Sequence, residues 1–90
     1  MTVRLDPELR RRLREEPGAQ VRLIVGVSGN LEDLAEELAQ AGLVVHRRLS
    51  LLNAVAVGAT GEQALALAQE PWVEWIEEDR EVRALGPRRP

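Results

Sequence analysis

The chain has 90 residues, of which 44% are hydrophobic, and its formal net charge is −3. This length suits one small domain, and the apolar fraction is sufficient for a folded core. The absence of cysteine excludes disulfides, thiolate metal sites and a cysteine nucleophile, and the single histidine, His46, excludes a histidine-rich metal site. The negative charge argues against general nucleic-acid binding.

No stretch of the sequence reaches the 18 apolar residues that predict a membrane span, and residues 1–7 lack the apolar core of a signal peptide. We therefore expect a cytoplasmic protein from the sequence as given, or a secreted one if an export segment precedes it. We expect no membrane, nucleic-acid or cofactor partner.

Residues 6–16 predict a short helix. Asp6 is a good N-cap and Pro7 suits the first helical position. Leu9 and Leu13 form only a narrow apolar stripe along this helix.

The arginines of this helix have acidic neighbours at helical spacing. Arg12 lies four residues from both Glu8 and Glu16, and Arg11 lies four residues before Glu15. We therefore interpret the arginine run as a solvated helix face rather than a nucleic-acid site.

The remaining elements follow from β-branched runs, helical periodicity and capping signals. Asn30 caps the better of the two later helices and Gly42 ends it, and Thr60 with Gln63 forms a capping box for the other. The predicted strands are residues 21–27, 43–49, 54–59 and 73–78, and the predicted helices are residues 31–41 and 61–69.

This order predicts an α+β fold, namely a ferredoxin-like βαββαβ sandwich. Its four-stranded antiparallel sheet has two helices on one face and the strand order fourth, first, third, second, and a short N-terminal helix precedes it. We expect three regions: an N-terminal helical extension (1–20), the ferredoxin-like domain (21–79) and an extended C-terminal tail (80–90).

The sheet face away from the helices is expected to be low and smooth in its centre. In the third strand Val55 and Val57 should face the helices, because side chains alternate along a strand. An uncovered face with apolar groups is usually a partner site. The residues expected on this face are Ile24, Gly26, Ala54, Ala56 and one of Trp75 and Ile76.

No catalytic set is evident, so we expect a protein that is not an enzyme. His46 is the only candidate base for Ser28 or Ser50, and its strand holds no acid to orient it.

The acids at 77–79 follow the last predicted strand. Glu77 and Glu78 should point to opposite faces, which argues against a metal site. Glu77 and Asp79 lie on one side and can cap the N-termini of two helices of a partner.

Three stretches together resemble a known family. They are Leu23-Ile24-Val25-Gly26-Val27, Leu52-Asn53-Ala54-Val55-Ala56-Val57 and Glu70-Pro71-Trp72-Val73-Glu74-Trp75-Ile76-Glu77-Glu78-Asp79. The last is similar to the signature Asp-Pro-x-Val-x-Tyr-Val-Glu-Glu-Asp of the inhibitor-type propeptides of subtilisin-like serine proteases, with Trp75 in the place of the tyrosine.

The resemblance implies a protein that binds and inhibits a subtilisin-like serine protease and assists its folding. It implies that the open face, with Trp75 as its aromatic residue, packs on two helices of the protease, and that Glu77 and Asp79 cap them. The tail residues Val82, Arg83, Ala84 and Leu85 would fill four subsites of the cleft, with Leu85 next to the scissile bond.

This reading implies a monomer when free, with no cofactor and no metal. The alternative is a ferredoxin-like module that binds a small molecule or associates with a second copy of itself.

Overall fold

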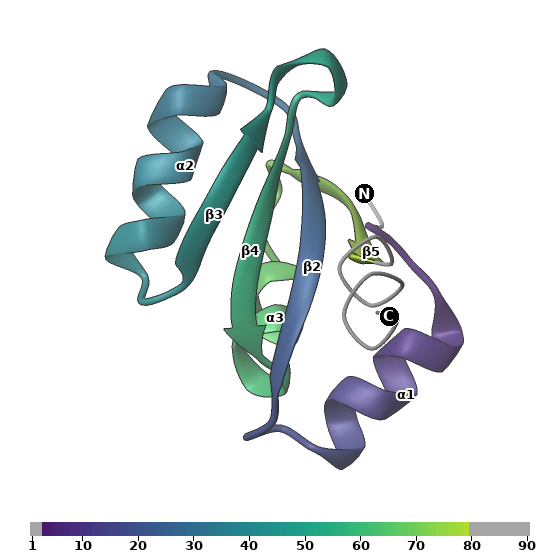
Figure 1. The fold of residues 1–90 in the computed structure, drawn as a ribbon. Coiled ribbons are helices and arrows are strands. Elements are labelled where there is room, and N and C mark those ends of the chain that lie inside the picture. The colour runs from purple at the N-terminus through teal and green to yellow at the C-terminus, as the bar shows by residue number, and fades with distance from the viewer. Residues whose placement is uncertain (1–2, 80–90) are drawn as a thin grey trace, which may run out of the picture.

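The computed structural model describes residues 3–79, which form an α+β fold of one sheet and three α-helices (Figure 1). The strands are β1 (Arg4–Leu5), β2 (Gln20–Val27), β3 (Val44–Leu49), β4 (Ala54–Thr60) and β5 (Val73–Glu78). The helices are α1 (Pro7–Glu15), α2 (Leu31–Gln40) and α3 (Gly61–Leu67), and a 3-10 turn, η1 (Ser50–Leu52), joins β3 to β4.

The sheet order is β1-β5-β2-β4-β3. Within the row β5-β2-β4-β3 adjacent strands are antiparallel, and these four strands stand in the predicted order. The prediction of a four-stranded antiparallel sheet is nevertheless wrong, because β1 adds a fifth strand parallel to β5 and makes the sheet mixed.

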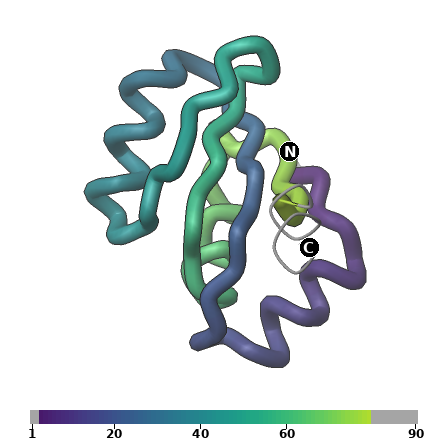
Figure 2. The backbone as a smooth tube through the Cα atoms, in the orientation of Figure 1, coloured from purple at the N-terminus to yellow at the C-terminus, as the bar shows by residue number. Residues whose placement is uncertain are grey.

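Strand β1 lies beside β5 at the edge of the sheet (Figure 2). Arg4 is opposite Trp75 and Leu5 is opposite Ile76. A strand of two residues has no alternation pattern long enough to detect. The pairing of β1 with β5 depends on where α1 packs, so the sequence analysis did not predict this strand.

One core lies between the sheet and the helices. Leu23, Val25, Val55 and Val57 are fully buried in it, as the alternation predicted. All three helices contribute buried side chains to the same core: Leu9 and Leu13 from α1, Ala35 and Leu38 from α2, and Ala64 and Leu67 from α3.

Helix α1 is therefore an integral part of the fold. It packs beside α3, and its two leucines are 4% and 1% exposed. The segment after α1 also contacts the start of α3, where the N–H of Glu62 donates to the carbonyl oxygen of Pro17 at 2.9 Å. The narrow apolar stripe of Leu9 and Leu13 is sufficient to attach α1 to the core, because both side chains are almost fully buried.

The predicted caps are all present. The side chains of Asp6, Asn30 and Thr60 accept hydrogen bonds from backbone N–H groups in the first turns of α1, α2 and α3. Gln63 completes the capping box, and Gly42 has a positive φ of 98° after α2. These local signals explain why the helix starts were predictable.

Gly61 permits the close approach of α1 and α3. A Cβ atom there would lie 2.6 Å from the carbonyl oxygen of Leu13 and 2.8 Å from that of Glu16. We expect Gly61→Ala to lower the free energy of unfolding by about 1–3 kcal/mol, measured by urea denaturation, because rigid backbone must move apart.

Gly18→Ala is the matched control. No atom lies within 4 Å of a Cβ at Gly18, so its free energy of unfolding should change by less than about 0.5 kcal/mol. Equal losses in the two variants would contradict the steric explanation.

Candidate functional site: the open face of the sheet

The strand register separates the two faces of the sheet. Gly26 is paired with Ala54 on one side and Trp75 on the other, and Ile24 is paired with Ala56. Residues opposite each other in a register project to the same face. Ile24, Gly26, Ala54, Ala56 and Trp75 therefore lie on one face, away from the core, which we call the open face. Of the two alternatives from β5, Trp75 lies on this face and Ile76 lies in the core.

The indole of Trp75 lies over Gly26. A Cβ atom on Gly26 would be 2.1 Å from Nε1 and Cε2 of the ring, so only glycine leaves room for it. Ala54 and Ala56 are buried although they lie outside the core between sheet and helices. The centre of the open face is therefore filled by an aromatic ring rather than bare.

The acids at the end of β5 are separated by the strand. Glu77 is opposite Ile24 and exposed, so its carboxylate belongs to the open face. Glu78 is opposite the core residue Leu23 and lies on the helix side. Asp79 is only 2% exposed, and its N–H donates to the carbonyl oxygen of Arg22 at 2.9 Å. Glu77 is accessible to a partner in this state, whereas Asp79 must first be uncovered.

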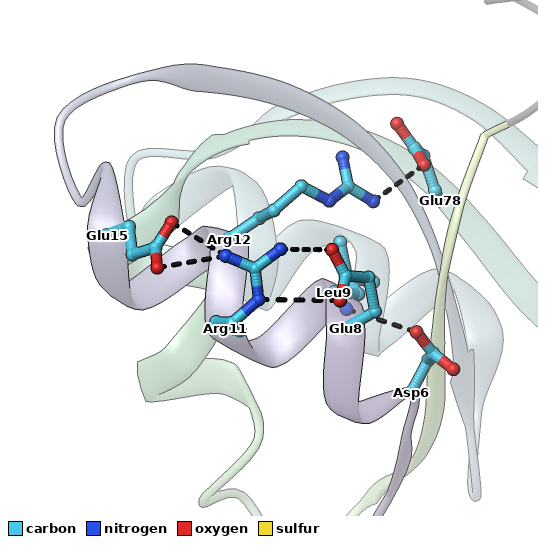
Figure 3. A network of polar contacts seen from close by, with 7 residues as sticks. All are labelled: Asp6, Glu8, Leu9, Arg11, Arg12, Glu15 and Glu78. Atoms are coloured by element: carbon cyan, nitrogen blue, oxygen red, sulfur yellow. Dashed lines mark hydrogen bonds and ion pairs between the residues drawn. The ribbon is translucent and has the colours of Figure 1, made fainter.

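A polar network connects α1 to β5 (Figure 3). The guanidinium of Arg12 donates to Oε1 of Glu78 at 3.0 Å. This hydrogen bond and the charge of Glu78 raise the pKa of Arg12. The link joins residues that are 66 positions apart in the sequence.

The ion pairs within α1 differ from the predicted set. Arg11 pairs with Glu15, as predicted, and also with Glu8. Arg12 turns to Glu78 instead of pairing with Glu8 or Glu16, so that prediction was wrong. Helical spacing shows which partners are in reach, but it cannot show a competing carboxylate from another element.

A groove of about 700 Å³ lies at the β1–β5 edge, next to the open face. Trp75 and Glu77 line it from β5, Arg4 from β1, and Leu9 and Arg12 from α1. The surface beside the open face is thus mixed in charge and partly apolar.

The structure also places the histidine that was considered as a catalytic base. The ring of His46 lies over Gly58, where a Cβ atom would lie 3.0 Å from Nε2 of the ring. Among residues 3–79 no group of three or more histidine, aspartate or glutamate side chains is placed to hold a metal ion. Within the same part of the chain, no helix is long and apolar enough to cross a membrane.

The predicted cleft-binding residues Val82, Arg83, Ala84 and Leu85 lie outside the described residues. No protein-family model and no curated protein matches the chain.

The packing of Trp75 on Gly26 can be tested by fluorescence. In a Trp72→Phe background, we expect Gly26→Ala to displace the indole of Trp75, shift its emission to the red and increase its quenching by acrylamide. Gly18→Ala in the same background should leave both properties unchanged. An unshifted Gly26→Ala spectrum would rule out the close contact.

Proposed function

We propose that this protein binds and inhibits a subtilisin-like serine protease. We infer that β5, β2, β4 and β3, with α2 and α3, form a ferredoxin-like unit to which β1 and α1 are added. The observation that carries the proposal is the position of Glu77. It shares the open face with Trp75 and Gly26, at the end of the strand that leads to residues 80–90.

In the proposed complex the open face packs on two surface helices of the protease. Trp75, whose indole fills the space over Gly26, supplies a large apolar contact. The carboxylate of Glu77 accepts the free N–H groups at the start of one helix, where the helix dipole favours negative charge. Asp79 caps the second helix after docking uncovers its carboxylate.

The tail residues Val82, Arg83, Ala84 and Leu85 would lie in the substrate cleft as an added strand, as a product does, with Leu85 next to the scissile bond. This mode of inhibition needs no catalytic group from the chain. Its affinity comes from two linked sites, the open face and the tail. Because such a partner binds the native protease and not the unfolded one, it also stabilises the native protease during folding.

Self-association is the second candidate, and the edge position of β3 favours it. The outer edge of β3 has no neighbouring strand among residues 3–79, and Val44 at its start is 55% exposed. A second copy could pair along this edge. Analytical ultracentrifugation decides between the candidates, because the inhibitor is expected to be a monomer.

The inhibitor proposal predicts that the full chain inhibits members of a subtilisin panel, measured as an inhibition constant with a chromogenic peptide. Removing residues 80–90 should raise that constant by about a hundredfold or more, because one of two linked sites is lost. Circular dichroism of the truncated chain checks that the fold is retained.

Two results would overturn this proposal. One is the absence of inhibition across the panel by the full chain. The other is an inhibition constant that is the same with and without residues 80–90.

Glu77→Gln tests the helix cap separately. We expect it to raise the inhibition constant about fivefold to thirtyfold, because a carboxylate at a helix N-terminus is lost while shape is kept. Glu36→Gln is the control, since Glu36 is an exposed carboxylate on α2, which packs on the opposite face. Equal effects of the two substitutions would point to net charge rather than to a cap.

A further inference from the structure

The end of β5 is held from three directions. On its outer edge, β1 pairs with Trp75 and Ile76. On its inner edge, the N–H of Asp79 donates to the carbonyl oxygen of Arg22 at 2.9 Å. From the helix side, the guanidinium of Arg12 reaches Glu78 at 3.0 Å (Figure 3). The end of an edge-proximal strand tends to fray, so contacts from three directions indicate that the position of this strand end matters.

Helix α1 is a firm base for Arg12. Leu9 and Leu13, three residues before Arg12 and one residue after it, are both buried in the core. The N-cap bond from the N–H of Leu9 to Asp6 fixes the start of the helix. Arg12 therefore projects from a helix that cannot shift without opening the core.

The pair of Arg12 and Glu78 is less exposed than the pairs that Arg11 makes, although the Arg12 side chain itself is 43% exposed. The side chain of Glu78 is only 19% exposed, whereas the carboxylates that Arg11 binds are 58–60% exposed. A charge-assisted hydrogen bond gains strength when its partners are partly removed from water. Because Glu78 is the last residue of β5, the Arg12–Glu78 pair connects the end of this strand to α1.

Holding Glu78 also determines where Glu77 points. Successive side chains of a strand project to opposite faces, so Glu78 on the helix side places Glu77 on the open face. If the strand end twists or frays, both carboxylates rotate together. The contact between Arg12 and Glu78 on the helix side of the sheet thus influences the orientation of the Glu77 carboxylate on the open face.

We propose that Arg12 is a positioning residue for partner binding, which holds Glu78 behind the sheet and thereby fixes the carboxylate of Glu77 on the open face. This inference rests on the proposed function. Arg12 acts from α1 through Glu78, whose side chain lies on the helix side of the sheet, and the benefit is preorganisation of Glu77 before the encounter. The N-terminal segment is then a brace for β5.

The test compares two arginines of the same helix. Arg12→Gln should raise the inhibition constant about threefold to tenfold, because Glu77 is no longer held in place. Arg11→Gln removes the same charge and breaks only the pairs with Glu8 and Glu15, so it should change that constant by less than about twofold. Equal constants for Arg12→Gln and the unmodified protein would overturn the proposal.

A double-mutant cycle separates positioning from general stability. In a Glu77→Gln background, Arg12→Gln should have little further effect on inhibition, because the carboxylate it positions is already absent. Effects on the inhibition constant that simply add would overturn the proposal. Arg12→Lys, which keeps the charge but not the planar fork, should recover part of the loss.

Amide hydrogen exchange tests the brace without any protease. The Asp79 amide should exchange about threefold to tenfold faster in Arg12→Gln than in the unmodified protein or in Arg11→Gln. Unchanged exchange would overturn the brace. If the unmodified protein inhibits no protease, the proposed function fails, and the exchange rates still decide whether Arg12 holds the end of β5.

Discussion

Strand β2 pairs antiparallel with β4 on one edge and with β5 on the other, and its register sets what each face of the sheet presents. At Gly26 the two neighbours are Ala54 and Trp75, and the missing side chain leaves the space that the indole occupies. A shift of β2 by one residue would move Leu23 and Val25 out of the core, and the same shift of β5 would take Trp75 and Glu77 off the open face. Core and candidate site therefore depend on the same pairing.

The N-terminal segment adds a second level of support. Leu9 and Leu13 join the common core, β1 covers part of the β5 edge, and Arg12 binds Glu78. The accessible groups identified on the open face include one indole, that of Trp75, and one carboxylate, that of Glu77. Holding these groups before the encounter lowers the entropy cost of binding. This gives the segment a physical role in the proposed inhibitor that the other four strands and two helices alone do not supply.

Much of the local structure was predictable. The capping residues Asp6, Asn30 and Thr60 indicated where the three helices begin, and the alternation of Val55 and Val57 with alanines indicated which face of β4 is buried. These signals act over a few residues, so the sequence contains them completely. The same alternation placed Ile24, Gly26, Ala54 and Ala56 on the open face, but it did not decide between Trp75 and Ile76. The strand register and the packing of Trp75 over Gly26 decided that choice.

The sequence by itself determined the helix starts, the buried faces of β2 and β4 and the separation of Glu77 from Glu78, because each depends on neighbours along the chain or on alternation. The order of four strands followed from the order of the elements and from the right-handedness of crossover connections. Only the tertiary structure decided that residues 4–5 become a fifth strand, that Arg12 binds Glu78 rather than Glu8 or Glu16, and that Asp79 is buried. Each of these outcomes is a competition between groups far apart in sequence. The outcome depends on which surfaces come into contact when α1 packs against the core, and the local spacing of residues does not determine those contacts.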